Sequence, residues 1–228
     1  MVAYGRTRNP GKIDPLAESI SYKTLVLSFS PAGFWMFDET SGTTATDLSG
    51  NGKHLTLTSG PVLTAGGPLG RFCEFDGSND YATGAGIALT GEWSAVAIVR
   101  IDAMADRQIV GNWDGSSMCW ILGLTSTGIE MYSKPSGFTG FGATTALTGV
   151  WSMVGCSRRS GTGASSLYRD GGQIGTGTVD AVSSSSSTEV GRKSSSLYIN
   201  GGICGVAVFP TALTTAQHLA LAQVAGLA

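Results

Sequence analysis

The chain has 228 residues, of which 42% are hydrophobic and 13% are charged, and its formal net charge is −2. The apolar content can fill one large core, while the charged fraction is about half of the usual ~25%. This charge balance argues against a nucleic-acid-binding face, and no run approaches the ~18 apolar residues of a membrane span. We expect a neutral polar surface suited to uncharged partners or to an assembly. The alternative is a β-rich protein whose turns need the 34 glycines.

The N-terminal segment differs in character from the rest of the chain. Residues 1–13 contain Pro10 and lack apolar periodicity, which predicts an extended arm. Asp14 can cap a helix and Pro15 suits its first position, so a short helix is predicted from Asp14 to about Leu25.

The same segment bears on export and on partners. Charged residues interrupt any apolar stretch of ~7–15 residues, so the N-terminus does not have the pattern of a secretory signal peptide. We expect Tyr4, Arg6 and Arg8 of the arm to contact a partner. The predicted organisation is an arm with a helix start over residues 1–21 and one domain over residues 22–228.

From Phe34 onward, short apolar runs alternate with turn signals every ~8–12 residues, which is typical of a β-sandwich or barrel. The longest apolar run, residues 93–101, predicts a central strand. Near the end, Thr214 and Gln217 have the spacing of a capping box and predict a final helix. The expected strands cover residues 34–37, 55–58, 72–75, 81–83, 93–101, 107–111, 118–124, 129–132, 151–157, 167–170, 189–192 and 202–209.

The four cysteines are far apart in the sequence, and each lies in an apolar run: Cys73, Cys119, Cys156 and Cys204. No pair has zinc-ligand spacing. We expect reduced thiols that behave as small core hydrophobes, because none of the three disulfide pairings can be chosen from spacing.

Several motifs follow one another in a characteristic order. They are Phe34-Trp-Met-Phe-Asp-Glu, Asp47-Leu-Ser-Gly-Asn-Gly, Gly67-Pro-Leu-Gly, Phe75-Asp-Gly-x-x-Asp-Tyr, Gly149-x-Trp, Leu167-Tyr-Arg-Asp-Gly, Gly202-x-Ile and Ala212-Leu-Thr. This order resembles a concanavalin A-like, laminin-G-like jelly-roll domain of a bacterial or bacteriophage member, from about residue 22 to 225. The resemblance implies an all-β sandwich of two antiparallel sheets, in a family whose members mostly bind glycans, proteins or matrix.

The resemblance also implies a calcium ion (Ca²⁺) at the rim of the sandwich. Asp47, Asn51 and Asp76 are the candidate ligands, because calcium prefers several oxygen ligands on loops. Relatives usually place an acidic residue on the last long strand, where this chain has Cys204-Gly205. The alternative is that the loop side chains only cap turns through their own backbone.

Glycoside hydrolysis would need two carboxylates flanking one bond. Asp38 and Glu39 are adjacent, so on a strand they point to opposite faces. Glu74 and Asp76 share a face, but Asp76 starts a turn. The family's Glu-x-Asp-x-x-Glu glucanase motif does not occur in the sequence. We therefore predict a protein without enzymatic activity.

Aromatic residues offer another route to a sugar site. Trp35, Trp93 and Trp151 fall in apolar runs and are predicted to lie in the core. Phe138 and Phe141 are expected in a loop, where they form either a contact surface or a lid on the core. A contact surface is the favoured interpretation.

Two classes of function follow. The first is a structural component of a bacteriophage virion, such as a capsid decoration, head fibre or tail protein. It would be anchored to other virion proteins through residues 1–21, assembled as an oligomer, and in contact with host glycans. The second is a free carbohydrate-binding lectin exported by a route other than the general secretory pathway. A glycan-active enzyme is a minor third alternative.

Overall fold

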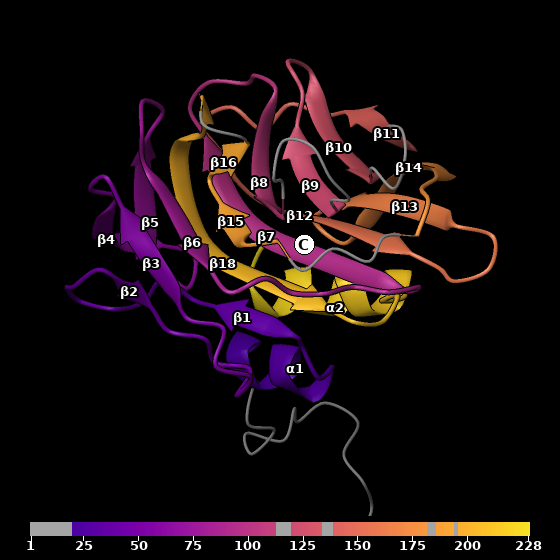
Figure 1. Cartoon of the computed structure of the whole chain (residues 1–228), viewed down its shortest axis with the longest axis horizontal. Coiled ribbons are helices and arrows are strands. Elements are labelled where there is room, and N and C mark those ends of the chain that lie inside the picture. The colour runs from indigo at the N-terminus through magenta and orange to yellow at the C-terminus, as the bar shows by residue number, and fades with distance from the viewer. Residues whose placement is uncertain (1–19, 113–119, 134–138, 182–185, 194–195) are drawn as a thin grey trace, which may run out of the picture.

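The computed structural model describes residues 20–112, 120–133, 139–181, 186–193 and 196–228. Over these residues the chain forms two eight-stranded antiparallel sheets, a small two-stranded sheet and two helices (Figure 1). The predicted all-β, two-sheet antiparallel jelly-roll sandwich is confirmed.

Sheet A has the order β14-β13-β12-β7-β18-β5-β4, and β1 also pairs with β18. Sheet B has the order β11-β10-β9-β8-β15-β6-β3-β2. The strands of sheet A are β1 (Gly33–Trp35), β4 (Val62–Gly67), β5 (Gly70–Asp76), β7 (Trp93–Ile101), β12 (Trp151–Arg158), β13 (Ala164–Arg169), β14 (Gly172–Thr178) and β18 (Asn200–Phe209). The strands of sheet B are β2 (Thr44–Ala45), β3 (Leu55–Thr58), β6 (Tyr81–Gly84), β8 (Arg107–Gly111), β9 (Trp120–Leu124), β10 (Gly128–Ser133), β11 (Thr139–Thr144) and β15 (Thr188–Val190).

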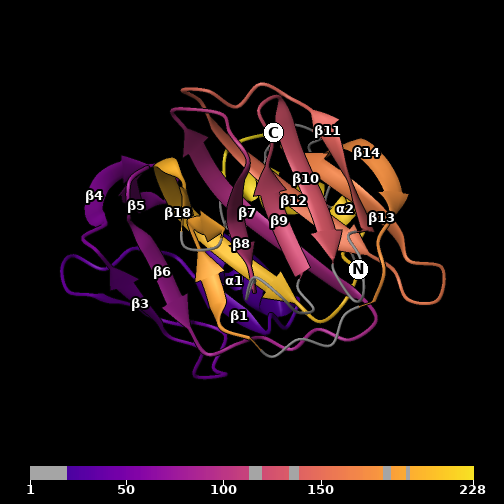
Figure 2. The ribbon, with the colours of Figure 1, turned by 45° about the horizontal axis from the view of Figure 1, so that its top comes forward.

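Sheet A is the middle layer of the molecule. One of its faces packs on sheet B, whose strands β8–β10 overlie β7 and β12 in Figure 2. The other face packs on the helices α1 (Tyr22–Ser28) and α2 (Thr215–Val224). This explains why β7 reads as one continuous apolar run: Ala97 and Val99 face sheet B, while Val96 and Ile98 face the helical layer. A strand covered on both faces needs apolar residues at every position.

The first helix differs from the prediction. It begins at Tyr22, because the hydroxyl of Ser21 accepts a hydrogen bond from the amide of Thr24 at 3.2 Å and Ser21 itself is extended. The expectation of one helix from Asp14 to Leu25 is therefore wrong at residues 20 and 21, which lie outside the helix. Residues 14–19 lie outside the described residues. A serine cap next to the apolar run decides where the helix starts.

The second helix begins as predicted. Thr214 Oγ1 accepts from the Gln217 amide at 3.3 Å, and the Gln217 side chain accepts from the Thr214 amide at 2.8 Å. These reciprocal hydrogen bonds satisfy amides that the first helical turn leaves unpaired.

A buried polar network fastens α2 to sheet A. His218 Nε2 lies 2.9 Å from the hydroxyl of Ser157, which donates to the carbonyl of Leu213 at 2.9 Å. The Leu213 amide donates to Ser94 at 2.8 Å, and the His218 ring stacks on Tyr168 at 3.8 Å between centroids. Burial lowers the pKa of His218 to about 3, so its imidazole is neutral at ordinary pH.

The described cysteines and tryptophans test the core predictions. Cys73, Cys156 and Cys204 are buried free thiols, as expected, while Cys119 lies outside the described residues. Trp35 and Trp93 are fully buried, also as expected. Trp151 differs: it is only half-buried and packs edge-on against Phe72 on the helical side of sheet A.

Candidate functional site

Asp47 organises the loop between β2 and β3 through hydrogen bonds to its carboxylate. Its carboxylate accepts hydrogen bonds from the amides of Phe34 at 3.0 Å, Ser49 at 2.9 Å and Lys53 at 2.8 Å, and from the Ser49 hydroxyl at 2.9 Å. Burial alone would raise the pKa of Asp47, but these hydrogen bonds outweigh burial and lower it. Four donors use the acceptor sites of a carboxylate.

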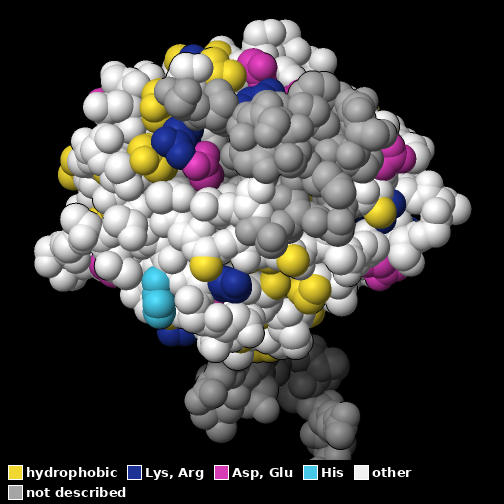
Figure 3. All heavy atoms as spheres, in the orientation of Figure 1, with side chains coloured by type: hydrophobic (Ala, Val, Ile, Leu, Met, Phe, Trp, Pro, Cys, Tyr) yellow, Lys and Arg dark blue, Asp and Glu magenta, His cyan; other side chains and the backbone are white. Residues whose placement is uncertain are grey.

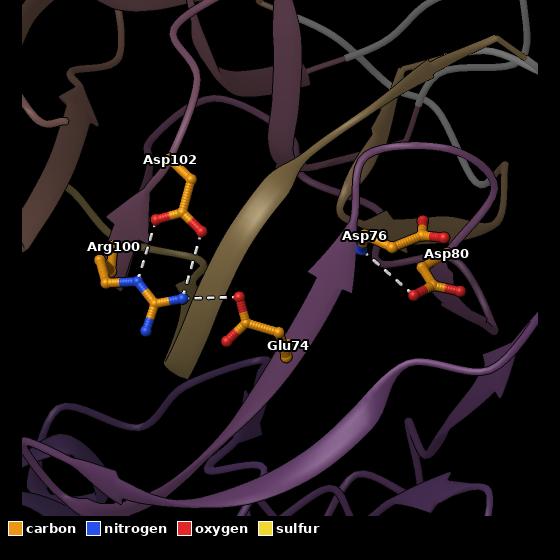
Figure 4. A network of polar contacts seen from close by, with 5 residues as sticks. All are labelled: Glu74, Asp76, Asp80, Arg100 and Asp102. Atoms are coloured by element: carbon orange, nitrogen blue, oxygen red, sulfur yellow. Dashed lines mark hydrogen bonds and ion pairs between the residues drawn. The ribbon is translucent and has the colours of Figure 1, made fainter. Parts of the chain in front are cut away.

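The other two candidate calcium ligands also stabilise local backbone. Asn51 Nδ2 donates to the carbonyls of Pro31 at 3.1 Å and Ala32 at 3.3 Å, which ties the loop to the entry of β1. Asp76 Oδ1 accepts from the amide of Ser78 at 2.8 Å and closes the turn after β5. The Asp76 amide donates to Asp80 at 3.2 Å (Figure 4).

These contacts do not fit a calcium site. The carboxylate of Asp47 is already filled by donors, and Asp76 is engaged in a different turn. Among the described residues, no group of three or more histidine, cysteine, aspartate or glutamate side chains could hold a metal ion. Calcium needs several free oxygens converging on one point, whereas these side chains cap turns.

Glu74, which the sequence analysis considered as one carboxylate of a hydrolytic pair, belongs to a cluster of charged side chains on sheet A. Arg100 Nη2 lies 2.6 Å from Glu74 Oε1, and Arg100 Nε lies 3.1 Å from Asp102 Oδ1. Figure 4 shows Glu74 turned toward Arg100, with Asp76 and Asp80 together at the end of β5. Glu74 and Asp76 therefore do not form the carboxylate pair that glycoside hydrolysis needs.

A surface hollow lined mainly by residues of β10 and β11 combines aromatic, charged and glycine residues. We call it the β10–β11 groove. Its volume is about 370 Å³, and it is lined by Thr125, Glu130, Met131, Tyr132, Gly140, Phe141, Gly142 and Lys193. This volume is within the range of small-molecule sites, which are ~300–1,000 Å³.

Strand register builds the groove. Ile129 and Met131 face the core, so the alternate residues Glu130 and Tyr132 point to the outer face of sheet B. On β11, Gly142 lies opposite Glu130 and Gly140 lies opposite Tyr132. Because Gly142 lacks a side chain, the flank of Glu130 stays open, whereas Gly140 is in close contact with Tyr132.

Lys193, on the short hairpin of β16 (Arg192–Lys193) and β17 (Leu197–Tyr198), closes the other side of the groove. Its Nζ lies 4.8 Å from the centroid of the Tyr132 ring, 2.6 Å from Asp106 Oδ1 and 3.6 Å from Glu130 Oε1. Glu130 Oε1 has no hydrogen bond among the described residues. Burial raises the pKa of Glu130, and Lys193 only partly offsets this effect.

A larger hollow of about 700 Å³ lies at the rim, between α1 and the Asp47 loop. Its two longest polar side chains already have partners within the fold: Lys53 Nζ donates to the carbonyl of Gly86 at 2.9 Å, and Asn51 donates to the carbonyls named above. The β10–β11 groove is smaller, but a tyrosine, a carboxylate and an ammonium group line it together; Tyr132 is 7% exposed and the Oε1 atom of Glu130 is buried. We therefore take the groove as the candidate site.

The predicted contact residues have mixed outcomes. Phe141 lies in strand β11 and not in a loop; it faces the core, and a Cβ atom on Gly177 of β14 would overlap its ring. It thus forms a lid on the core and also lines the groove. Its contact with a partner remains a prediction. Tyr4, Arg6, Arg8 and Phe138 lie outside the described residues.

Sequence reasoning missed Glu130 and Lys193 as site residues. A usable signal was present: Ile129-Glu-Met-Tyr alternates in the manner of a half-exposed strand, and Gly140 and Gly142 repeat at the same spacing on the next run. Lys193 gave no such signal, because it is 63 residues beyond Glu130 and only the fold brings the two together.

Comparison with known proteins places the fold in a family. Residues 76–217 match the concanavalin A-like lectin/glucanases superfamily, in its laminin-G-like form. The chain belongs to this superfamily. Among curated proteins, no sequence matches significantly. No helix in the described part of the chain is long and apolar enough to cross a membrane.

Solved structures of this superfamily's fold are similar at low identity. Domain 4 of an extracellular arabinanase from Geobacillus stearothermophilus, solved with arabinotriose, has a TM-score of 0.70 and 19% identity, covering 85% of this chain and 98% of that one. The ligand-binding domain of botulinum neurotoxin serotype D, solved with N-acetylneuraminic acid, has a TM-score of 0.68 and 13% identity, covering 87% and 52%. The binding domain of Paraclostridial Mosquitocidal Protein 1 has a TM-score of 0.67 and 13% identity, covering 86% and 52%. This chain thus spans about half of the two toxin chains.

Proposed function

We propose that this protein is a non-enzymatic glycan-binding domain and that the β10–β11 groove is its binding site. The observation that carries the proposal is the groove itself, in which Glu130, Tyr132 and Lys193 face a strip of glycine backbone. Sugar sites commonly combine an apolar or aromatic wall with a few polar groups that fix orientation. The arabinanase domain solved with arabinotriose and the toxin domain solved with N-acetylneuraminic acid support binding of glycans by this fold.

The surface composition agrees with such a role. Figure 3 shows charged and hydrophobic side chains scattered among neutral polar and backbone atoms on the described part of one face. A surface with few charges suits hydroxyl-rich ligands, whose recognition depends on hydrogen bonds and shape.

A glycan array followed by titration calorimetry tests the proposal. Gly142→Val places a branched side chain beside Glu130 in the groove, so it should weaken binding of the best oligosaccharide by at least ~10-fold, or about 1.4 kcal/mol. Gly172→Val is the matched control, because Gly172 is exposed on β14 and an added Cβ would approach only the Arg169 carbonyl, at 3.4 Å. Equal affinities of the two variants would refute the groove as the site, and an array without any bound glycan would refute glycan binding.

We further propose that the domain is displayed on a virion surface, is anchored to other virion proteins through residues 1–21 and assembles as an oligomer. The resemblance of the sequence motifs to bacterial and bacteriophage members of the family motivates this second proposal. Deleting residues 1–13 should abolish incorporation into particles and leave glycan affinity unchanged. Normal incorporation of the truncated chain would contradict the anchor.

A further inference from the structure

We infer that the β10–β11 groove selects uncharged, hydroxyl-rich glycans and rejects acidic ones. This inference rests on the proposed function and narrows its ligand class. The described residues that line the groove or pair with a lining charge include two carboxylates, Glu130 and Asp106, and one ammonium group, Lys193. The local charge is therefore −1, the arithmetic being one positive against two negative groups.

The ammonium group of Lys193 is not available to attract an anion. Its Nζ lies 2.6 Å from Asp106 Oδ1 and 3.6 Å from Glu130 Oε1, and the side chain is only 13% exposed. It also lies over the Tyr132 ring at 4.8 Å. An acidic sugar would have to displace an existing ion pair to reach Lys193, and it would do so beside two like charges. Such juxtaposition of like charges is unfavourable and is a common means of rejecting ligands.

Glu130 has the opposite preference. Its Oε1 is buried and lacks a hydrogen bond, while the Glu130 side chain as a whole is 21% exposed. Hydroxyl donors that reach the exposed part of this half-buried carboxylate would stabilise its charged form. The hydroxyl groups of a neutral sugar supply such donors without adding charge. Burial, together with the nearby charge of Asp106, raises the pKa of Glu130, and Lys193 only partly offsets this effect.

Gly140 and Gly142 of β11 line one side of the groove, and Gly142 leaves space beside Glu130. Gly142 lies opposite Glu130 on β11, and the nearest atoms to a Cβ atom there would be the Ile129 carbonyl oxygen at 3.2 Å and side-chain atoms of Glu130 and Thr125 at 3.8 and 3.9 Å. A sugar ring can therefore lie flat beside the carboxylate. Thr125 also lines this end of the groove, where its Cγ2 lies near Gly142 and its hydroxyl accepts from the Thr127 amide at 3.2 Å.

The test compares two panels of glycans on the full chain. The neutral panel contains arabino-, xylo-, gluco- and galacto-oligosaccharides, and the acidic panel contains sialyllactose and oligogalacturonates. We expect the best neutral ligand to bind at least ~10-fold more tightly than any acidic one. Glu130→Lys should lower this ratio at least ~10-fold, because it replaces the repelling charge with an attracting one.

Glu92→Lys is the matched control. It makes the same change in net charge, but Glu92 precedes β7 and accepts from the Ser160 hydroxyl at 3.2 Å, and it does not line the groove. This variant should keep the wild-type ratio. Glu130→Gln provides a variant of the same shape, in which the loss of discrimination should be partial.

The outcomes separate the two levels of the proposal. Acidic glycans that bind the wild type as tightly as neutral ones would overturn the inference and leave the proposed function intact. An equal effect of Glu92→Lys and Glu130→Lys would also overturn it, because the preference would then come from net charge. An absence of binding in both panels would overturn the proposed function.

Discussion

Gly140 lies directly opposite Tyr132 in the pairing of β11 with β10, so close that a Cβ atom on Gly140 would overlap the Cβ atom of Tyr132. Gly142, two residues further on the same face, has no contact of that kind. One glycine is therefore required by the fold, while the other leaves room in the groove.

This difference predicts unequal effects on stability. Gly140→Ala should lower the free energy of unfolding by about 1–3 kcal/mol, because an added methyl group forces β10 and β11 apart. Gly142→Ala should cost less than about 1 kcal/mol. Urea denaturation of both variants measures the two values, and similar losses would contradict the described packing.

A second glycine supports the contact between the edges of the two sheets. A Cβ atom on Gly177 of β14 would overlap the ring of Phe141 on β11. Gly177→Ala should therefore destabilise the chain by about 1–3 kcal/mol. In a Phe141→Ala background most of this cost should disappear, because contacting residues couple in a double-mutant cycle. Purely additive losses would show that the two residues do not touch.

The buried His218 predicts a specific dependence of stability on pH. Its pKa is lowered to about 3 in the folded chain, below its ordinary value of 6.5 in the unfolded chain. Between these values the unfolded state binds a proton that the folded state does not, so stability falls as pH falls from about 6.5 toward 3, by up to about 1.4 kcal/mol per pH unit.

The comparison that isolates this effect is with His218→Gln, which cannot titrate. The wild type should lose more stability than the variant over the same pH interval, as measured by urea denaturation at each pH. Parallel stability curves would mean that His218 becomes protonated without leaving its site. Because other acidic groups titrate in both proteins, only the difference between the curves is diagnostic.

The hydrogen bonds of Asp47 predict a loss of stability when this residue is replaced. Asp47→Ala leaves three buried or half-buried amides without their acceptor and should cost about 2–4 kcal/mol. Alanine at the exposed Asp38 is the control and should cost less than about 0.5 kcal/mol.

Since the Asp47 carboxylate is filled by donors, a calcium chelator should leave the thermal midpoint of the wild type unchanged. A clear drop with chelator would restore a calcium site at the rim.

The sequence was informative wherever structure is decided by near neighbours. The capping box of Thr214 and Gln217 spans three residues, and the turn around Asp76 uses amides two and three residues away. Such contacts leave a local pattern. The start of α1 was misplaced because Asp14 and Ser21 are both good caps, and local preference alone does not choose between them.

The groove could not be found in the same way. Glu130 and Lys193 meet because β10 lies two strands from β8 in sheet B and the β16–β17 hairpin packs against β8. Their ion pair depends on strand order and register, which single residues do not encode. The alternation of glycines on β11 is visible in the sequence, but its meaning depends on which strand lies opposite.

The location of glycan binding is the central claim, and mapping it by NMR tests the claim most directly. Titrating an isotope-labelled chain with the best oligosaccharide from the array should shift backbone amide signals around Glu130, Tyr132, Gly142 and Lys193. The amides of Asn51 and Lys53, at the larger rim hollow, should stay unchanged. Shifts concentrated at the rim hollow, with none at β10 and β11, would contradict the account.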